Sequence, residues 1–432
     1  MLQTGLIPNA HNDLVTDASY DFYGLRLATC SLDQRIKIWQ LDEENGTWNV
    51  EDDWKAHDAA ISKVSWAHPE FGSVLASASF DRTVKVWEQT ATADVDLSQM
   101  NGTVGPSNSR WVERAMLVDA KGTVRAVEFA PQQFGLKLAT ISSDNHLRVY
   151  ECLEQPSLST WQLSEEVDVL SLPSTSPANR SNPQTVTLAT PTQLSAPLDS
   201  TSASLVTHAL QQQQQLSQAP TRPGLGNREA DGGWCISWCK DKYWGEIIAA
   251  GCGINGTVKI IHLAPSHRPT TLLTLDPSPT PYNTSSEGTT KAVPASPSDN
   301  ETPKSFAITS VAWAPSCGRS YHLVATGGRD GHVRIWRVKP PTPDDDQDGG
   351  DGEADITEGR WSASIVGDFD DHKFAVGRVE WNITGTILSS SGNDGRIRLW
   401  KMTAGNVWRP AGHISVEQAE EQADVEMPPA ED

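Results

Sequence analysis

Residues Trp66 to Trp87, WAHPEFGSVLASASFDRTVKVW, decide the fold. They contain a short apolar strand at Val74 to Ser77, a tight turn that carries Asp81, and a second strand at Val84 to Trp87 in which apolar and polar residues alternate. An acidic or amide residue stands six positions before an aromatic or aliphatic residue here and at five other places. The six pairs are Asp33 and Trp39, Asp81 and Trp87, Asp144 and Tyr150, Asn255 and Ile261, Asp330 and Trp336, and Asp394 and Trp400. Identical spacing in six copies predicts a repeat protein.

Each copy extends to a four-stranded antiparallel unit of about 40 to 45 residues once insertions are removed, as is typical of the WD-repeat blade. A single blade cannot bury both of its faces, whereas six blades stacked around an axis can. We therefore predict an all-β fold, a six-bladed WD-repeat β-propeller over residues 1–412. Stretches rich in Ser, Thr, Pro, Gln or acidic residues predict disordered insertions at about 90–109, 164–231, 276–304 and 339–359, and a disordered acidic tail at 413–432.

The chain is acidic, with a formal net charge of -21. Nucleic-acid binding requires a basic face that neutralises phosphates, and the sequence offers none. Two acidic runs, Asp344 to Asp355 and Glu417 to Asp432, are typical of solvated loops or tails. The first ten residues do not resemble a secretory signal, and no apolar run approaches the roughly 18 residues of a membrane span. These features predict a soluble cytosolic or nuclear protein.

The six cysteines are scattered in or beside predicted strands, which predicts reduced thiols in the core. Cys235 and Cys239 are separated by three residues and have no paired histidines nearby, so the spacing does not predict a zinc site. We expect no metal and no cofactor. The run Gly251 to Gly256 matches G-x-G-x-x-G, but the residues after it are β-branched, whereas a dinucleotide site requires a helix there. A two-residue hairpin turn at Asn255-Gly256 is the preferred interpretation.

A polar pattern recurs in units one, two and six. In each unit a His precedes the first strand, a Ser or Thr stands four residues before the Asp, and a Trp closes the third strand. A chain of hydrogen bonds through these side chains would satisfy buried polar groups and fix the turn. The same residue types suggest a hydrolase, but an enzyme needs one nucleophile, not three at equal spacing. We therefore predict structural networks and no catalytic residue. Their members are His11, Thr29, Asp33 and Trp39; His57, Ser77, Asp81 and Trp87; and His372, Ser390, Asp394 and Trp400.

The strand count predicts that the ring is not closed by the chain itself. Unit one has its own four strands, and unit six finds all four of its strands downstream, the last at Asn406 to Pro410. Only Met1 to Ala10 is left over. An unlatched ring exposes an apolar sheet face, which a partner could cover by adding strands. The candidate partner-binding residues are Leu6, Ile7, Leu14, Ile397, Leu399 and Trp408.

Three stretches, beginning at His11, Trp66 and Asn393, resemble the small six-bladed WD-repeat nucleoporin of the Y-shaped nuclear-pore scaffold, the homologue of the Sec-thirteen coat protein. They read HNDLVTDASYDFYGLRLATCSLDQRIKIW, WAHPEFGSVLASASFDRTVKVWE and NDGRIRLWKMTAGNVW. The resemblance covers all six blades and none of the long insertions. Two departures are the missing His before unit three, and Gly251 and Ile261 in unit four.

The resemblance implies an open propeller that is completed in trans by a blade from an α-solenoid nucleoporin. It implies a scaffold subunit of the nuclear pore Y-complex at the nuclear envelope, supporting transport of protein and mRNA, with the other Y-complex members as partners. It also implies membership of a coat-like complex at the vacuolar or lysosomal membrane that regulates nutrient (TOR) signalling. The alternatives are a peptide-reading adaptor of a ubiquitin ligase or of chromatin, and a secretory-coat subunit.

Overall fold

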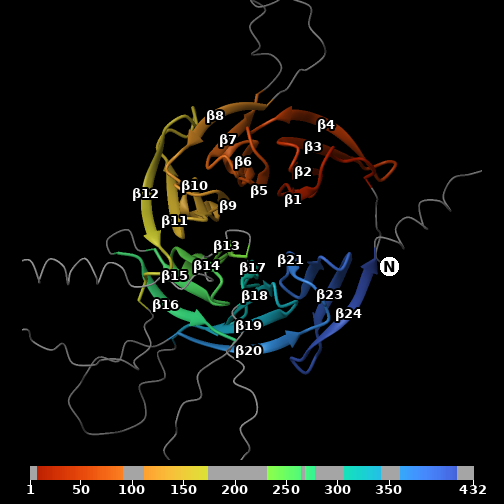
Figure 1. Ribbon diagram of the computed structural model, residues 1–432, viewed down its shortest axis with the longest axis vertical. Coiled ribbons are helices and arrows are strands. Elements are labelled where there is room, and N and C mark those ends of the chain that lie inside the picture. Colours follow the sequence, from red (N-terminus) through yellow and green to blue (C-terminus); the bar gives the residue numbers. More distant parts are fainter. Residues whose placement is uncertain are drawn as a thin grey trace, which may run out of the picture. The chain divides into compact units, whose positions relative to one another are not determined.

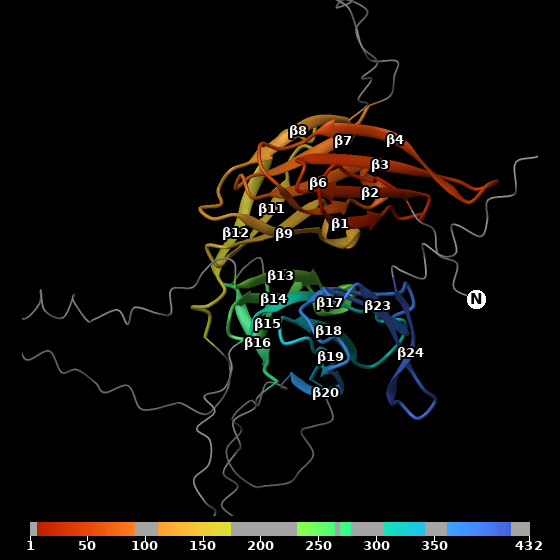
Figure 2. The ribbon, with the colours of Figure 1, turned by 45° about the vertical axis from the view of Figure 1, so that its right-hand side comes forward.

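The computed structural model describes residues 7–90, 111–173, 231–263, 268–277, 306–341 and 361–415. The chain divides into two units, residues 1–175 with 229–432 and residues 176–228, and every described residue belongs to the first. Within it, six four-stranded antiparallel sheets follow one another in chain order and form a ring (Figure 1), which confirms the predicted six-bladed β-propeller. In the tilted view of Figure 2, the inner strands β1, β9, β13 and β17 border the central space.

The strand bounds of the first three sheets are as follows. The first sheet comprises β1 (Val15–Tyr20), β2 (Arg26–Ser31), β3 (Arg35–Asp42) and β4 (Thr47–Lys55). The second comprises β5 (Ile61–Trp66), β6 (Val74–Ser79), β7 (Val84–Gln89) and β8 (Trp111–Leu117). The third comprises β9 (Val124–Phe129), β10 (Lys137–Ser142), β11 (His146–Cys152) and β12 (Trp161–Asp168).

The other three sheets repeat this order. The fourth comprises β13 (Gly233–Trp238), β14 (Ile247–Gly253), β15 (Val258–His262) and β16 (Thr270–Leu275). The fifth comprises β17 (Ile308–Trp313), β18 (His322–Gly328), β19 (Val333–Lys339) and β20 (Ser362–Phe369). The sixth comprises β21 (Val376–Trp381), β22 (Ile387–Gly392), β23 (Arg396–Met402) and β24 (Trp408–Ser415).

The repeated acidic residue shapes the turn between the second and third strands of a sheet. Asp81 accepts a hydrogen bond from the backbone N–H of Thr83 at 2.9 Å, and Asp33 accepts one from Arg35 at 3.0 Å. The residue after the Asp is left-handed, with φ of 71° at Arg82. A carboxylate that accepts the N–H two residues on stabilises such a turn. The local sequence therefore sets this hairpin in the five sheets that carry the turn Asp and, through it, the strand register.

Two predicted boundaries are wrong. The disordered insertion was expected from residue 164, but β12 continues to Asp168. The last strand was expected at Asn406 to Pro410 with a disordered tail from 413, but β24 continues to Ser415. In both cases an outer strand needs few apolar residues, since one of its faces meets solvent. The other predicted insertions, and the tail beyond 415, fall almost entirely outside the described residues.

The connection in the fourth sheet also differs from its prediction. Strand β14 ends at Gly253 and β15 begins at Val258, so residues 254–257 form a four-residue connection, not the two-residue turn expected at Asn255-Gly256. A strand, not a helix, follows this glycine-rich run. The helix N-terminus that a dinucleotide site requires is therefore missing here.

Candidate functional site

Neighbouring sheets pack face to face, and the contact between the first and second sheets shows how. Ile36 and Ile38 of β3 point toward the second sheet, where they meet Leu75 and Trp87 in one hydrophobic cluster. Ile36 and Ile38 are fully buried, and Trp87 is 5% exposed. We call this contact the first–second seam. Burial of this hydrophobic cluster contributes to the free energy that holds one sheet against the next.

The corresponding positions of the sixth sheet are not covered in this way. The register pairs Ser391 with Ile397 and Ser389 with Leu399, as it pairs Cys30 with Ile36 and Ala28 with Ile38. Ile397 is 44% exposed and Leu399 is half-buried. The matching third-strand residues of the other five sheets are each at most 2% exposed, namely Ile36 and Ile38, Val84 and Val86, Leu147 and Val149, Val258 and Ile260, and Val333 and Ile335. We call Ile397, Leu399 and the half-buried Ile414 the sixth-sheet face.

The first sheet carries the matching uncovered surface on its other side. Tyr20 pairs with Leu27, Leu27 with Trp39 and Trp39 with Val50, so these side chains lie in one row on one face. Tyr20 is 58% exposed and Val50 is 51% exposed, while Trp48 is half-buried with its ring 5.8 Å from that of Tyr20. We call Tyr20, Trp48 and Val50 the first-sheet face.

The two sheets touch near the ring axis. Arg378 of β21 forms an ion pair with Asp17 of β1 and also donates a hydrogen bond to the carbonyl oxygen of Ala18. The Asp17 side chain is 5% exposed and also accepts a hydrogen bond from the backbone N–H of Val64. Burial alone would lower the pKa of Arg378, but the attraction of Asp17 and Glu380, together with the hydrogen bond to Asp17, raises it. We call this contact the first–last seam; it is joined at its inner end by charge.

The structure places the predicted partner-binding residues unevenly. Leu6 lies outside the described residues, Ile7 is half-buried, and Leu14 is 71% exposed beside β1. Ile397 and Leu399 belong to the sixth-sheet face. Trp408 does not, because it is 4% exposed and packs against Trp381 with ring centroids 5.4 Å apart. Including Trp408 was therefore wrong, since its side chain fills the core between the fifth and sixth sheets.

Sequence reasoning missed the first-sheet face. Tyr20 occupies the place of Trp66 in the second sheet, and Trp48 occupies the place of Trp111. Trp66 and Trp111 pack against the first sheet at the first–second seam. Comparing the aromatic residues that end the first strands would have revealed the equivalence of Tyr20 and Trp66. It would not have revealed that Tyr20 stays exposed.

The predicted polar networks are assembled in three sheets. In the second sheet, a nitrogen of His57 lies 2.7 Å from the Ser77 hydroxyl and the other lies 2.9 Å from Asp81, and the Trp87 indole N–H donates to Ser77 at 2.9 Å. The first sheet joins His11 to Thr29 at 2.8 Å and to Asp33 at 3.0 Å, with Trp39 donating to Thr29 at 2.9 Å. The sixth sheet joins His372, Ser390, Asp394 and Trp400 over 2.8 to 3.1 Å.

Burial separates these networks from a hydrolase site. Ser77 and Ser390 are fully buried and Thr29 is 5% exposed, so no substrate reaches these hydroxyls. Burial alone would raise the pKa of Asp81, but hydrogen bonds from His57 and Thr83 outweigh it and hold the pKa well below the usual range. The carboxylate therefore stays ionised as the acceptor of its network.

The third sheet, whose His is missing, uses arginine instead. Arg148 is fully buried and donates to Ser142 at 2.9 Å and to Asp144 at 2.8 Å. It also meets Glu166 at 2.8 Å. A bidentate guanidinium thus replaces the His-to-hydroxyl connection and keeps the turn carboxylate paired.

The described residues contain no group of three or more His, Cys, Asp or Glu side chains that could hold a metal ion. Cys235 and Cys239 are both buried, and burial raises the pKa of each thiol to about 12. Thiols with such pKa values are poor metal ligands and poor nucleophiles. No helix within the described ranges is long and apolar enough to cross a membrane.

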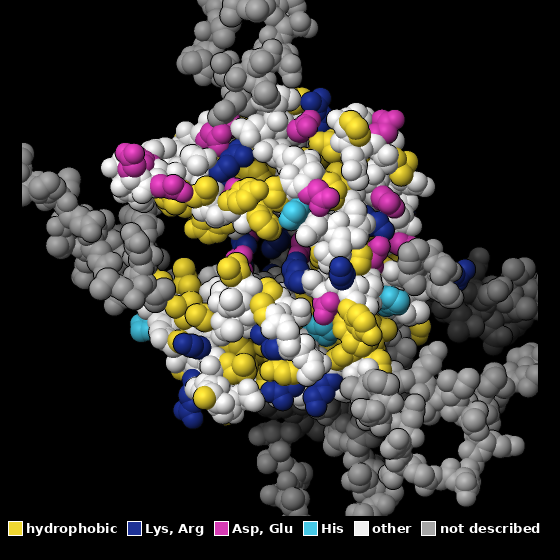
Figure 3. Space-filling view, turned by 180° about the vertical axis from the view of Figure 1, so that it is seen from behind, with side chains coloured by type: hydrophobic (Ala, Val, Ile, Leu, Met, Phe, Trp, Pro, Cys, Tyr) yellow, Lys and Arg dark blue, Asp and Glu magenta, His cyan; other side chains and the backbone are white. Residues whose placement is uncertain are grey.

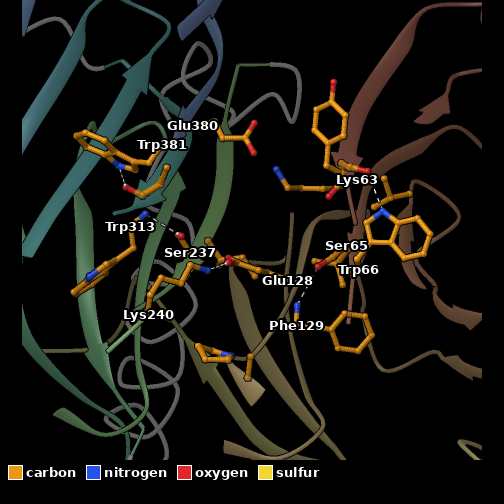
Figure 4. Close-up of a pocket in the computed structure, with 18 of the residues that line it drawn as sticks. Lys63, Ser65, Trp66, Glu128, Phe129, Ser237, Lys240, Trp313, Glu380 and Trp381 are labelled. Carbon is orange, nitrogen blue, oxygen red and sulfur yellow. Dashed lines mark hydrogen bonds and ion pairs between the residues drawn. The ribbon is translucent and has the colours of Figure 1, made fainter. Parts of the chain in front are cut away.

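The ring encloses a central cavity of about 600 Å³, lined by residues from all six inner strands. Seen from behind in Figure 3, this part of the surface is hollowed and contains both basic and acidic side chains. In Figure 4, Lys240 from beyond β13 reaches Glu128 of β9, with which it forms an ion pair, and Trp381 donates to the carbonyl oxygen of Ala312 at 3.0 Å. These side chains are paired with their neighbours. They do not form the aromatic cage or single-sign funnel that a peptide-reading propeller would use.

Six four-stranded sheets, five of them with an Asp in the repeated turn, and buried polar networks define a WD-repeat propeller. The family model for the WD domain, G-beta repeat, matches residues 3–40, 48–88, 301–337 and 363–401. The third and fourth sheets, which contain the departures in sequence, lie outside these matches.

Known relatives cover almost the whole chain. The chain is 30% identical to nucleoporin seh1 of Schizosaccharomyces pombe, over 96% of this chain and 97% of that one. It is 31% identical to nucleoporin SEH1 of Saccharomyces cerevisiae, over 95% and 99%, and 33% identical to human nucleoporin SEH1, over 93% and 85%. The chain belongs to the SEH1 family of WD-repeat nucleoporins. It is a non-enzymatic scaffold protein of the nuclear pore complex at the nuclear envelope, as the resemblance predicted.

Proposed function

We propose that the first–last seam is open and that an α-solenoid nucleoporin fills it with a strand-forming segment, as a blade added in trans. The observation that carries this proposal is the exposure of Ile397. Five sheets bury the matching residue completely or nearly so, and the sixth leaves it 44% exposed. A partner blade would bury the sixth-sheet face on one side and the first-sheet face on the other.

Residues 7–10 leave the seam uncovered. They join none of the sheets, and each sheet of the described residues has four strands. Uncovered apolar faces and strand edges promote aggregation, so a stable complex is expected to cover them. The chain would then act as a rigid clamp on the solenoid within the Y-shaped scaffold and support transport of protein and mRNA. The same seam would accept the solenoid subunits of a coat-like, nutrient-signalling complex.

Co-expression with the solenoid nucleoporin, followed by size-exclusion chromatography and affinity measurement, tests the proposal. Ile397→Glu with Leu399→Glu should weaken binding at least about 100-fold, because two carboxylates would face an apolar blade. Ile383→Glu is the matched control, since Ile383 is 89% exposed in the same sheet, in a loop away from the sixth-sheet face. Unchanged binding by the double variant, or equal loss in the control, would contradict the seam as the docking site.

A further inference from the structure

The connection between β1 and β2 carries two large aromatic side chains that the fold leaves in solvent. Phe22 is 65% exposed and Tyr23 is 67% exposed. Their rings contact each other edge to face, with centroids 5.3 Å apart, and the Phe22 ring lies 4.8 Å from that of His68. Exposed aromatic clusters are costly in water and are enriched at protein interfaces.

The same connection in three other sheets carries an aromatic residue that is tucked in. Phe71, Phe134 and Trp244 each lie in a short 3₁₀ turn and are half-buried against the hydrophobic core beside their own sheet. The ring of Phe134, for example, stacks on Trp238 at 6.4 Å. In each of these three sheets at least one aromatic residue of the connection therefore serves packing, and in the fourth sheet the exposed Tyr243 adjoins the packed Trp244. In the first sheet both aromatic residues of the connection are exposed.

The exposed pair lies close to the first-sheet face at the rim of the central cavity, whose lining includes Tyr20, Phe22 and His68. Tyr20, two residues before Phe22, belongs to that face and contacts Trp48. The surface made by Tyr20, Phe22, Tyr23, Trp48 and His68, which we call the aromatic ledge, therefore runs from the first–last seam onto the adjoining end of the propeller. A polypeptide that fills the seam and leaves it at this end would pass over the ledge.

The charge beside the aromatic ledge is negative. The last residue of β3 is Asp42, and the turn to β4 carries Glu43 and Glu44. A hydrogen bond of 2.9 Å from the N–H of Leu41 to the carbonyl oxygen of Leu25 holds the end of β3 to the β1–β2 connection. Glu43 and Glu44 are exposed. The nearby Arg26 is already used, since its guanidinium donates to Glu51 at 3.0 Å and lies over Trp66 at 5.2 Å. A complementary ligand is therefore apolar and basic.

We infer that the aromatic ledge is a second docking site for the partner that fills the seam, and that it takes a segment in which apolar side chains are flanked by Lys or Arg. This inference depends on the proposed function. It assigns a task to residues outside the added blade: they fix the direction in which the partner leaves the propeller, because two contacts restrict orientation where one does not.

Two probes separate the ledge from the seam: the intact solenoid partner, and its strand-forming segment alone. Phe22→Ala with Tyr23→Ala should weaken binding of the intact solenoid about 30-fold or more, and should leave binding of the isolated segment unchanged. Tyr243→Ala is the matched control, because Tyr243 is an aromatic residue of the same connection in the fourth sheet and is 80% exposed. Glu43→Gln with Glu44→Gln should weaken intact-solenoid binding severalfold and reduce its salt dependence.

The outcomes distinguish the two proposals. Unchanged solenoid affinity in the Phe22 and Tyr23 variant, with the Ile397 and Leu399 variant still defective, would overturn the ledge and keep the seam. Equal loss for both probes would also overturn it, since the loop would then act through the seam. If the loop variant instead abolishes self-association of the isolated chain in sedimentation, the ledge binds a second copy and the inference is wrong. Failure of the Ile397 and Leu399 variant to affect either probe would remove the proposed function itself.

Discussion

The two faces of the first sheet differ in their exposure to solvent. On one face, Ile36 and Ile38 are fully buried against the second sheet. On the other, Tyr20 and Val50 remain more than half exposed toward the first–last seam. Equivalent positions in repeated units therefore differ in solvent exposure, according to which sheet packs against them. Exposure at such a position is the observation on which the proposed partner blade depends.

The difference extends to how each seam is held. Near the axis, the first–second seam has a hydrogen bond from the Thr16 hydroxyl to the Ile61 carbonyl at 2.6 Å and one from the Trp66 indole to the Ser19 carbonyl at 2.9 Å, together with its hydrophobic cluster. At the first–last seam, Arg378 forms an ion pair with Asp17 and donates a hydrogen bond to the carbonyl oxygen of Ala18. Among the described residues, the contacts of Arg378 join the inner ends, and the proposed function requires that the outer strands receive another chain.

The largest expected effect compares the same substitution on the two kinds of face. Val84→Asp places a carboxylate at a position that is 2% exposed and should lower the free energy of unfolding by more than about 4 kcal/mol. Ile397→Asp, at the equivalent exposed position, should lower it by about 1 kcal/mol or less. Urea denaturation followed by tryptophan fluorescence measures both. Equal losses would mean that the sixth-sheet face is packed in solution.

The next effect concerns the buried networks. Ser77→Ala removes the acceptor of the Trp87 indole and the partner of His57, and should lower the free energy of unfolding by about 1 to 3 kcal/mol. Ser389→Ala is the control at the first–last seam. It should change the free energy of unfolding by about 0.5 kcal/mol or less, since Ser389 is not fully buried. Thermal unfolding measures both, and a neutral Ser77→Ala would contradict a stabilising network.

A smaller effect is expected at Arg378, which joins the inner ends of the first–last seam. Arg378→Gln should lower the free energy of unfolding by about 1 to 2 kcal/mol, because Asp17 keeps its bond from Val64. Amide hydrogen exchange in β1 and β21 should become faster. Arg35→Gln breaks the more exposed pair with Asp53 and should have an effect near zero. If exchange accelerates only at distant strands, Arg378 does not hold this seam.

The smallest effect is a dependence on pH. Burial lowers the pKa of His322 and of His372 from the ordinary value of 6.5. The unfolded chain therefore takes up these protons first as the pH falls, so the stability from the neutral rings is present above about pH 6.5 and declines below it. The melting temperature should fall between pH 7 and pH 5. His322→Phe should make that fall shallower, because His322 is 3% exposed among tryptophan rings.

A steeper fall in the His322→Phe variant would contradict this assignment. The carboxylates of the turns affect stability in a separate, lower range of pH. Hydrogen bonds outweigh burial and lower the pKa of Asp81 and Asp394, so their contribution is complete above about pH 4 and is lost only in stronger acid.

The repeated turn made most of the fold predictable from sequence. Asp33, Asp81 and their equivalents fix local hairpins, so the number of sheets and their strand order follow from short-range spacing. Strand ends such as Asp168 and Ser415 were not predictable, because an outer strand is defined by its neighbour and not by its own hydrophobicity. Trp408 was wrongly predicted to bind a partner for a related reason, because the residue type does not indicate which side of the sheet the side chain faces.

By itself, the sequence determined that this is a propeller of six repeated sheets with buried polar networks, since a carboxylate that accepts the N–H two residues on acts within a few residues of chain. Only the tertiary structure decided which faces stay uncovered. Tyr20 and Ile397 are separated by nearly the whole chain, and each has the same local pattern as its buried counterparts. Their exposure depends on the distance between two sheets that are remote in sequence, and packing of the entire ring sets that distance.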